Sequence, residues 1–217
     1  METLKPNTSY HIFNHANGFE NVFHNDENFQ YFLLKYKLYI HPIAETYAYC
    51  LLPNHFHLVV RIRKREIIEE IIRTKNSTTN NFSKVWNFGK VRITDDEIER
   101  YLSKQFANLF SCYTQSFNKV FKRRGSLFIK NFRRNAILDR DHFINTIIYT
   151  HRNPVHHGFC SGYNDWGYSS YSEIVELKSE IVEVDKIVKI FKSRNQFIEM
   201  HQQNLDKFYH ISELEAP

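Results

Sequence analysis

The sequence predicts an α+β fold: a ferredoxin-like antiparallel sheet with helices packed on it, followed by a helical C-terminal extension. Two observations support this prediction. Segments with the alternation of strands and segments with helical periodicity follow one another in the order strand, helix, strand, strand, helix, strand, helix. The two consecutive strands are separated only by Pro53-Asn54, a dipeptide typical of a tight turn, which favours antiparallel pairing.

A first strand is expected near the N-terminal end. Residues 8–14 (TSYHIFN) alternate between side-chain types as a strand with one buried face does. Asn17-Gly18 favours a tight hairpin turn, so residues 20–24 are expected to form a short partner strand.

A helix and a pair of strands are expected next. Asp26 can cap the helix, and Pro42 ends it. The apolar face of this helix comprises Phe29, Phe32, Leu33, Tyr36 and Ile40. Residues 43–52 and 55–62 follow as two strands joined by the turn at Pro53-Asn54.

The central part of the chain divides into a charged connection and a long helix. Residues 63–92 are rich in charged and small polar side chains and are interpreted as an insertion or flexible connection, with a short helix at residues 66–74. Thr94 and Glu97 have the spacing of a capping box. Behind this box, apolar residues recur at helical spacing: Ile98, Leu102, Phe106, Leu109, Tyr113, Phe117 and Val120.

The last strand and helix of the predicted fold complete the order. Residues 126–138 are expected to form the fourth strand. Asp139 is expected to cap a helix that Pro154 ends. The apolar face of that helix comprises Phe143, Ile144, Ile147, Ile148 and His151.

The chain is therefore divided into two parts. Residues 1–171 are assigned to one domain that contains all the elements above. Residues 172–217 are assigned to a helical extension, with helices near residues 185–191 and 193–203.

The composition limits where the protein acts and what it binds. A formal charge of +5 and an isoelectric point near 9.0 favour a polyanionic partner. The cysteines Cys50, Cys112 and Cys160 are odd in number and widely spaced, which is typical of a reducing compartment. The N-terminal end lacks the apolar stretch of a signal peptide, and no run of about 18 apolar residues occurs. A cytoplasmic protein without a membrane span is therefore expected.

One short motif suggests a metal site. His55 and His57 are alternate residues of a predicted strand, so both imidazoles project from one face, while Phe56 points to the opposite layer. Two imidazoles so placed can hold one divalent ion. The alternative is a chance pair among 12 histidines, which a short motif alone does not exclude.

A second polar pair lies on the last helix of the predicted fold. Tyr149 and Asn153 are four residues apart and therefore share one face of the helix. The Asn153 amide oxygen would complete a site of two nitrogens and one oxygen, which is compatible with Mg²⁺ or Mn²⁺. The alternative makes Tyr149 a tyrosine at the edge of the core and Asn153 a residue of the helix end.

These motifs resemble those of a known family. The segments LLPNHFHLVV (residues 51–60) and YTHRNPVHHGF (residues 149–159) resemble the histidine strand and the tyrosine helix of the single-tyrosine HUH transposases. They are most similar to the branch called REP-associated tyrosine transposases, whose DW-x-x-S-S segment is matched by Asp165-Trp166 and Ser169-Ser170. The resemblance covers roughly residues 9–171, and two separated motifs in the same order make it specific.

The resemblance implies a role for each motif residue. His55 and His57 correspond to metal ligands of the family, Tyr149 to its nucleophile and Asn153 to a third metal ligand. The implied activity is cleavage and rejoining of single-stranded, hairpin-bearing DNA through a 5′-phosphotyrosine intermediate, with Mg²⁺ or Mn²⁺ as the metal. The resemblance leaves open whether the protein acts as a monomer or as a homodimer.

A basic segment suggests where DNA binds. Residues 119–134 contain no acidic residue, and they lie at the end of the long helix and on the strand that leads to the tyrosine helix. Their basic residues are Lys119, Lys122, Arg123, Arg124, Lys130, Arg133 and Arg134. Phe128 and Phe132 lie between them and are interpreted as core residues in preference to base-stacking ones. A second basic patch follows the histidine strand, at Arg61, Arg63, Lys64 and Arg65.

The sequence leaves other functions open. They are a domesticated protein that binds hairpin or repeat DNA without mobilising it, a metal-dependent hydrolase that uses the two histidines, and a purely structural ferredoxin-like module. The products distinguish them, because only the tyrosine mechanism leaves protein joined to a 5′ DNA end.

Overall fold

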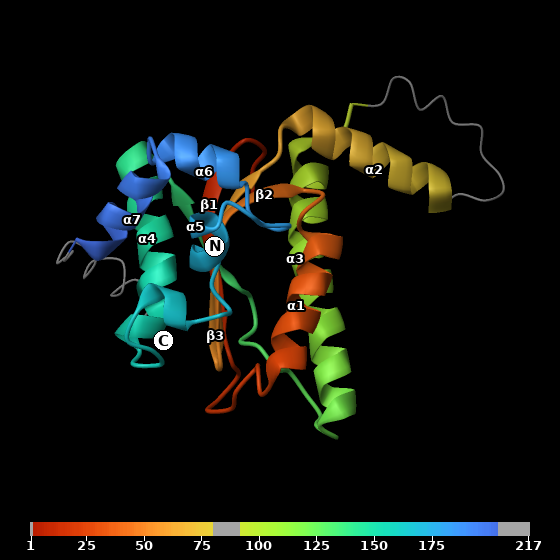
Figure 1. Cartoon of the computed structure of the whole chain (residues 1–217). Coiled ribbons are helices and arrows are strands. Elements are labelled where there is room, and N and C mark those ends of the chain that lie inside the picture. Colours follow the sequence, from red (N-terminus) through yellow and green to blue (C-terminus); the bar gives the residue numbers. More distant parts are fainter. Residues whose placement is uncertain (1, 80–91, 204–217) are drawn as a thin grey trace.

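A four-stranded antiparallel sheet forms the centre of the protein (Figure 1). The computed structural model describes residues 2–79 and 92–203. The strands are β1 (Ser9–His15), β2 (Ala44–Leu52), β3 (His55–Ile62) and β4 (Arg133–Ile137), in the order β2-β3-β1-β4 across the sheet. This order and the antiparallel pairing of all neighbours confirm the predicted α+β, ferredoxin-like fold and its β2–β3 hairpin.

Helices cover both faces of the sheet (Figure 1). Two of them, α1 (Asp26–Tyr39) and α3 (Asp95–Val120), pack together on one face. On the other face lie α4 (Arg140–His156), the short turn η1 (Tyr163–Asp165), α5 (Tyr171–Val175), α6 (Val184–Ile190) and α7 (Arg194–Gln202). The remaining helix, α2 (Arg65–Thr79), contacts α3 and leads away from the sheet. No helix within residues 2–79 and 92–203 is long and apolar enough to cross a membrane.

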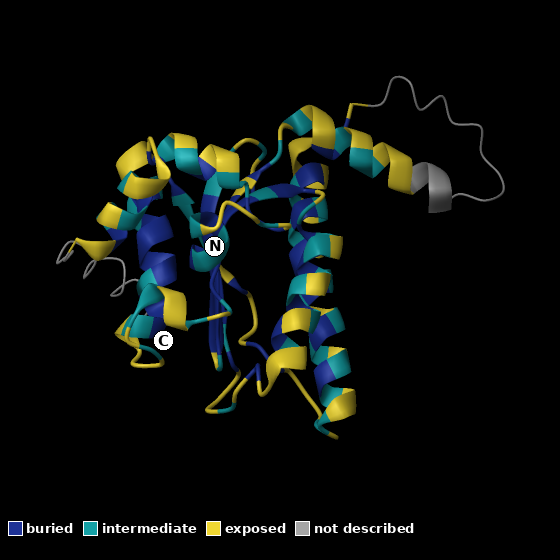
Figure 2. Ribbon diagram, viewed as in Figure 1, coloured by how far each residue is buried: buried dark blue, intermediate teal, exposed yellow. Residues whose placement is uncertain are grey.

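The alternation of side chains along β3 gives the sheet two different faces. Phe56 points toward α1 and α3, where its ring centroid lies 5.3 Å from that of Phe32 and 5.5 Å from that of Phe110. His55 and His57 project from the opposite face, toward α4. Figure 2 shows that the strands and the inner sides of the helices are buried on both sides of the sheet. Apolar side chains are thus buried on both faces of the sheet, and the α4 face also contains the histidines.

The predicted helix caps are confirmed for two helices and wrong by one residue for the third. Thr94 and Glu97 form both hydrogen bonds of a capping box at α3. Asp139 accepts a hydrogen bond from a first-turn backbone N–H of α4. At α1 the cap is Asn25, and Asp26 is the first helical residue, where a carboxylate interacts favourably with the helix dipole.

The predicted strand at residues 20–24 is wrong, because these residues form no strand. The turn before it is present, with Gly18 at a φ of 98°. The backbone N–H groups of Val22 and Phe23 both donate to the carbonyl oxygen of Pro53, at 2.7 and 2.9 Å. The segment is therefore held by the turn between β2 and β3, while both edges of β1 are occupied by β3 and β4.

The predicted fourth strand, residues 126–138, is too long, because a wide bulge interrupts it. Phe13 pairs with Arg133, and Ala16 pairs with Phe128. From one pair to the other, β1 advances by three residues and the opposite segment by five, so that segment has two extra residues. Asn131 lies in this bulge with a φ of 68°, a left-handed conformation that asparagine tolerates. Regular pairing is therefore confined to Arg133–Ile137.

Two helix ends also differ from expectation. Pro154 does not end α4, which continues to His156. A proline in the last turn removes a single backbone donor, the one expected to bond the carbonyl of Thr150, and this loss is small where the helix is about to end. The expected short helix at residues 66–74 is longer and forms α2, whereas residues 80–91 of the charged connection lie outside the described residues.

A buried chain of hydrogen bonds joins the C-terminal helix α7 to α4 and β2. His201 Nδ1 lies 2.8 Å from the carbonyl oxygen of Phe197, which can only accept a hydrogen bond. His201 Nε2 therefore accepts from His151 Nδ1 at 2.9 Å, and His151 Nε2 accepts from the Ser170 hydroxyl at 2.8 Å. Ser170 Oγ in turn accepts from the backbone N–H of Tyr49 in β2 at 2.9 Å. Both imidazoles are thereby satisfied in their neutral forms.

Replacing His201 with Ala should lower the free energy of unfolding by about 2–4 kcal/mol. The change leaves a cavity beside Phe197 and deprives the His151 Nδ1–H group of its acceptor. Urea denaturation followed by circular dichroism measures the loss. The matched control is His156→Ala, an exposed histidine of α4, which should change stability by no more than about 0.5 kcal/mol. Equal losses in the two variants would contradict a stabilising role for the buried chain.

Candidate active site

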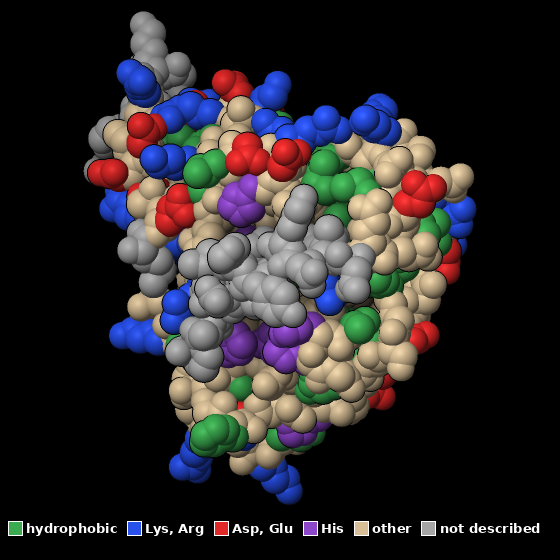
Figure 3. All heavy atoms as spheres, turned by 90° about the vertical axis from the view of Figure 1, so that its left-hand side faces the viewer, with side chains coloured by type: hydrophobic (Ala, Val, Ile, Leu, Met, Phe, Trp, Pro, Cys, Tyr) green, Lys and Arg blue, Asp and Glu red, His purple; other side chains and the backbone are tan. Residues whose placement is uncertain are grey.

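Four histidines lie on one face of the two central strands. The register of β1 against β3 places His15 opposite His55 and Phe13 opposite His57. Because alternate residues share a face, His11 belongs to the same face. The imidazole rings of His15 and His55 stack at 4.7 Å, and those of His11 and His57 at 5.3 Å. Figure 3 shows the α4 side of the molecule, where other histidine side chains reach the surface, whereas His11, His55 and His57 are buried.

The helix α4 places a tyrosine and an asparagine over these histidines. The Tyr149 ring centroid lies 5.8 Å from that of His57 and 6.0 Å from that of His11, nearly perpendicular to both. Asn153, one turn further along α4, has its Oδ1 atom 3.0 Å from His55 Nε2. The structure therefore brings together the four residues singled out from the sequence, two from β3 and two from α4.

The two β3 histidines are held in their neutral forms. Burial, and after it the neighbouring His57, lower the pKa of His55 to about 2, while the hydrogen bond to Asn153 opposes the shift. Burial also lowers the pKa of His57 to about 3, with His15 and His157 adding to the effect. A neutral imidazole has a lone pair to offer a metal ion, whereas a protonated one has none.

The contacts of His55 fit a cation between His55 and Asn153. Its Nδ1 atom lies 2.7 Å from Asn54 Oδ1 and its Nε2 atom 3.0 Å from Asn153 Oδ1. A neutral imidazole carries one proton, so it cannot donate to both oxygens. The 3.0 Å between His55 Nε2 and Asn153 Oδ1 places a nitrogen and an oxygen side by side, as two donors to one divalent ion would be. The Nδ1–H group would then donate to Asn54 and orient the ring.

A metal at this position would need the amide oxygen as a ligand. Within the described residues, no group of three or more histidine, cysteine or acidic side chains has the geometry of a metal site. His55 and His57 with the Asn153 oxygen remain as a set of two nitrogens and one oxygen, as the sequence predicts. This set is compatible with Mg²⁺ or Mn²⁺.

Three histidines of the site and Asn54 are missed by the sequence analysis. His11 Nε2 lies 3.1 Å from His57 Nδ1, so it can fix the orientation of that ring. His15 stacks on His55, and the His157 ring lies 5.0 Å from the His55 ring. The signal for His11 and His15 is their even spacing, with His11 in the first predicted strand and His15 one residue beyond its predicted end, but only the pairing of β1 with β3 turns that spacing into a shared site.

The basic residues of the 119–134 segment are placed in different surroundings. Exposed side chains near the end of α3 are Lys119, Lys122 and Arg124. Arg123 is not available in the same way, because its guanidinium pairs with Glu20 and donates to Asn118 and the Ser126 carbonyl.

The other three basic residues lie in the edge strand β4 or just before it. Arg133 is exposed and lies opposite Phe13, on the histidine face of the sheet. Arg134 lies on the α3 face, where it donates to Ser103 Oγ at 3.1 Å. Lys130 is exposed in the bulge between them and Phe128.

The remaining aromatic and basic candidates have structural roles, with the exception of Lys64. Phe128 and Phe132 are buried in the core, as expected. In the second basic patch, Arg63 contacts Glu45 and the His41 carbonyl, and Arg65 pairs with Glu69 and Asp95. Arg61 donates to Asn7, and Lys64 is exposed. This patch therefore mainly ties β3 to its surroundings.

Comparisons with known proteins agree with the two sequence motifs. No family model matches the chain. A curated protein of Haemophilus influenzae, described as a putative REP-associated tyrosine transposase, is 27% identical over 147 residues, which cover 67% of this chain and 68% of that protein. A solved structure of a REP-associated tyrosine transposase bound to a REP hairpin has the same fold, with a TM-score of 0.51 and 16% identity over 85% of this chain and 87% of the other. The resemblance inferred from the motifs is confirmed.

Acid should destabilise the protein before its carboxylates protonate. The pKa of His151 is lowered by burial like those of His55, His57 and His201, the last to about 3. In the unfolded chain these histidines protonate near pH 6.5, so the unfolded state binds more protons and stability falls as pH drops from 6.5 toward 3. Each should cost about 1.3 kcal/mol between pH 7.5 and pH 5.5. Urea denaturation at both pH values, with a chelator present, measures this.

The double variant His55→Gln, His57→Gln provides the internal control. It removes two of the four imidazoles whose pKa is lowered, so the difference in unfolding free energy between pH 7.5 and pH 5.5 should shrink by about half. An unchanged difference would show that other groups set the acid sensitivity.

Proposed function

We propose that this protein, whose sequence and fold resemble those of REP-associated tyrosine transposases, cleaves and rejoins single-stranded DNA with Tyr149 as nucleophile. The comparisons support a transposase-like role on hairpin DNA, because the structural relative is described as bound to a REP hairpin. The observation that carries the proposed chemistry is the convergence of α4 on β3. Tyr149 lies over His57, and Asn153 contacts His55 at 3.0 Å.

His55, His57 and Asn153 are the residues that would hold a divalent cation. When bound, Mg²⁺ or Mn²⁺ would polarise a non-bridging oxygen of the scissile phosphate and reduce the charge that repels a nucleophile. Asn54 and His11 would orient the two imidazoles from behind through their contacts with His55 Nδ1 and His57 Nδ1.

Tyr149 would supply the covalent step. Its phenolic oxygen forms a bond to phosphorus, and the bond from phosphorus to the 3′ oxygen breaks. The departing oxygen takes up a proton and becomes a 3′ hydroxyl, and the 5′ phosphate stays on the tyrosine. No water is consumed, so a 3′ hydroxyl can attack the phosphotyrosine and rejoin two ends. This reversibility favours strand transfer over hydrolysis.

Basic side chains near the site would hold the DNA backbone. Arg133 projects from the histidine face at the edge of the sheet, closest in the register to Phe13 and His57. Lys119, Lys122 and Arg124 are exposed near the end of α3. Contacts of this kind position the strand by its phosphates and carry no sequence information. Arg123 is better suited to holding Glu20 than to binding DNA.

Tyr149→Phe should abolish formation of the covalent protein–DNA adduct. The variant keeps the ring and removes only the hydroxyl, so folding and DNA binding should persist while adduct formation falls at least about 1,000-fold. The measurement is incubation of protein, Mn²⁺ and a 3′-labelled single-stranded hairpin, followed by denaturing electrophoresis. Tyr168→Phe is the matched control, because its exposed hydroxyl bonds Asp26 on α1. An adduct mapped by mass spectrometry to another tyrosine would contradict the assignment.

The histidines should determine Mn²⁺ affinity in a graded way. His55→Ala with His57→Ala should weaken Mn²⁺ binding at least about 100-fold in calorimetry, because two ligands are lost. His11→Ala should weaken it about 10- to 100-fold, because it removes only the group that orients His57. His156→Ala, on the exposed end of α4, should leave it unchanged. Equal Mn²⁺ affinity in all variants would exclude the site.

A further inference from the structure

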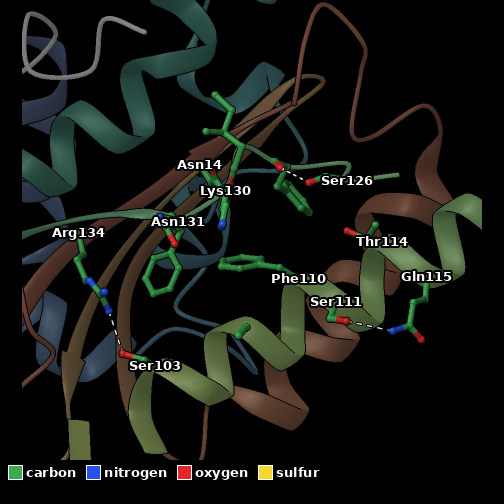
Figure 4. A pocket seen from close by; sticks show the side chains of 14 residues that line it. Asn14, Ser103, Phe110, Ser111, Thr114, Gln115, Ser126, Lys130, Asn131 and Arg134 are labelled. Atoms are coloured by element: carbon green, nitrogen blue, oxygen red, sulfur yellow. Dashed lines mark hydrogen bonds between the residues drawn. The ribbon is translucent and has the colours of Figure 1, made fainter. Parts of the chain in front are cut away.

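A hollow of about 560 Å³ lies between α3 and the bulged segment that leads into β4 (Figure 4). It is bordered on the helix by Ser103, Phe110 and Ser111, and on the segment by Lys130, Asn131 and Arg134. We name this hollow the α3–β4 pocket. It opens on the α3 side of the sheet edge, so it is separate from the Tyr149 site on the opposite face.

The lining combines an aromatic wall with hydroxyl, amide and cationic groups. Phe110 is partly exposed and points into the space together with Lys130 (Figure 4). The Arg134 guanidinium lies 4.7 Å from the Phe132 ring centroid and donates to Ser103 Oγ. None of the residues that line the pocket is acidic. An aromatic ring for stacking beside cations for a phosphate is the combination by which proteins bind unpaired nucleotides.

The bulge makes this pocket and relates it to the candidate active site. Its two extra residues move the chain away from β1 and leave room beside α3. Arg133 and Arg134 are neighbours in β4 and therefore project to opposite faces of the sheet. Arg133 lies on the histidine face and Arg134 on the pocket face, so this edge of the sheet presents one cation to each site.

We propose that the α3–β4 pocket binds an unpaired base, with its phosphate, from the single-stranded DNA that flanks the hairpin. This inference rests on the proposed function only in taking single-stranded DNA as the substrate. The base stacks on Phe110, and Lys130 and Arg134 contact the phosphate. A base within a duplex is stacked and paired on its own strand, so the pocket selects unpaired nucleotides. It thereby distinguishes a flanked hairpin from a bare one.

Filling the pocket tests this inference without touching the chemistry. Ser111 is exposed on α3, so Ser111→Trp should fold normally while occupying the space of the base. The DNA is a hairpin whose single-stranded flank carries 2-aminopurine at one position at a time. In the Tyr149→Phe background, one flank position should change its fluorescence on binding. Ser111→Trp should abolish that change and weaken binding of the flanked hairpin roughly tenfold or more, with no effect on the bare hairpin.

Leu34→Trp provides the matched control, because it adds the same ring at an exposed position of α1. It should bind the flanked hairpin like the parent protein. If Ser111→Trp gives the same affinity and the same 2-aminopurine profile as Leu34→Trp, the pocket does not hold a base.

Two charge variants distinguish binding in the α3–β4 pocket from general electrostatic attraction to DNA. Lys130→Gln and Lys119→Gln each remove one exposed lysine of the same basic segment, and each should lower the slope of log affinity against log salt by about 0.7. Only Lys130→Gln should also reduce the 2-aminopurine change at the pocket position. Equal fluorescence changes in the two variants would overturn the assignment of Lys130.

The experiment distinguishes a failure of this inference from a failure of the proposed function. Binding and fluorescence are measured in Tyr149→Phe, so they do not depend on cleavage. If the protein forms the covalent adduct but Ser111→Trp changes neither binding nor fluorescence, the proposed function stands and the assignment of the pocket is wrong. If the protein forms no adduct but Ser111→Trp abolishes the fluorescence change, the assignment of the pocket stands and the proposed cleavage chemistry is wrong.

Discussion

In the centre of the sheet, β1 pairs with β3 in a register that sets His15 opposite His55 and Phe13 opposite His57. Both faces of the molecule follow from this pairing. It directs Phe56 into the core beneath α1 and α3, and it gathers histidines from two strands beneath α4. Because side chains alternate with a period of two, a slip of one residue would exchange the faces and bury imidazoles among phenylalanines. The register is therefore set by the apolar core, and the candidate site is its consequence.

The cost of this arrangement is that several imidazoles are buried beside one another. Water would stabilise their protonated forms, and its exclusion lowers the pKa of His55 and His57 far below neutrality. The same exclusion keeps both lone pairs available to a cation at any physiological pH. Lower stability in acid and the proposed capacity to bind a metal would thus have one physical cause.

The features that depend on short-range patterns could be predicted from the sequence. Alternation identified the two strands of the hairpin, and the box at Thr94 identified the start of α3. The errors occur where distant contacts decide. Residues 20–24 bond to the carbonyl of Pro53, and the bulge at Asn131 depends on how the chain passes between β1 and α3. Neither has a signal in the local sequence.

The candidate site divides in the same way. Helical spacing placed Tyr149 and Asn153 on one face of a helix, and strand alternation placed His55 and His57 on one face of a strand. Spacing in the sequence was therefore enough to define each pair. That the two pairs meet was implied by the family resemblance. The contribution of His11 and Asn54 follows only from contacts between elements. The division of cations between the two faces at Arg133 and Arg134 likewise needs the register of β4.

One turn of α4 is held from two sides, and this connects the C-terminal extension to the candidate nucleophile. Tyr149 and Asn153 face the histidines of the sheet, while His151, about 200° around the helix from Tyr149, points instead toward Ser170 and α7. His151 is fixed by Ser170 and by His201 of α7, and Asn153 is fixed by His55. The position of the Tyr149 ring over His57 therefore depends on contacts with β3 on one side and with α7 on the other. A nucleophile must be held to within a fraction of an ångström of its reactive position. Helix α7 thus contributes to the geometry of the site through His151.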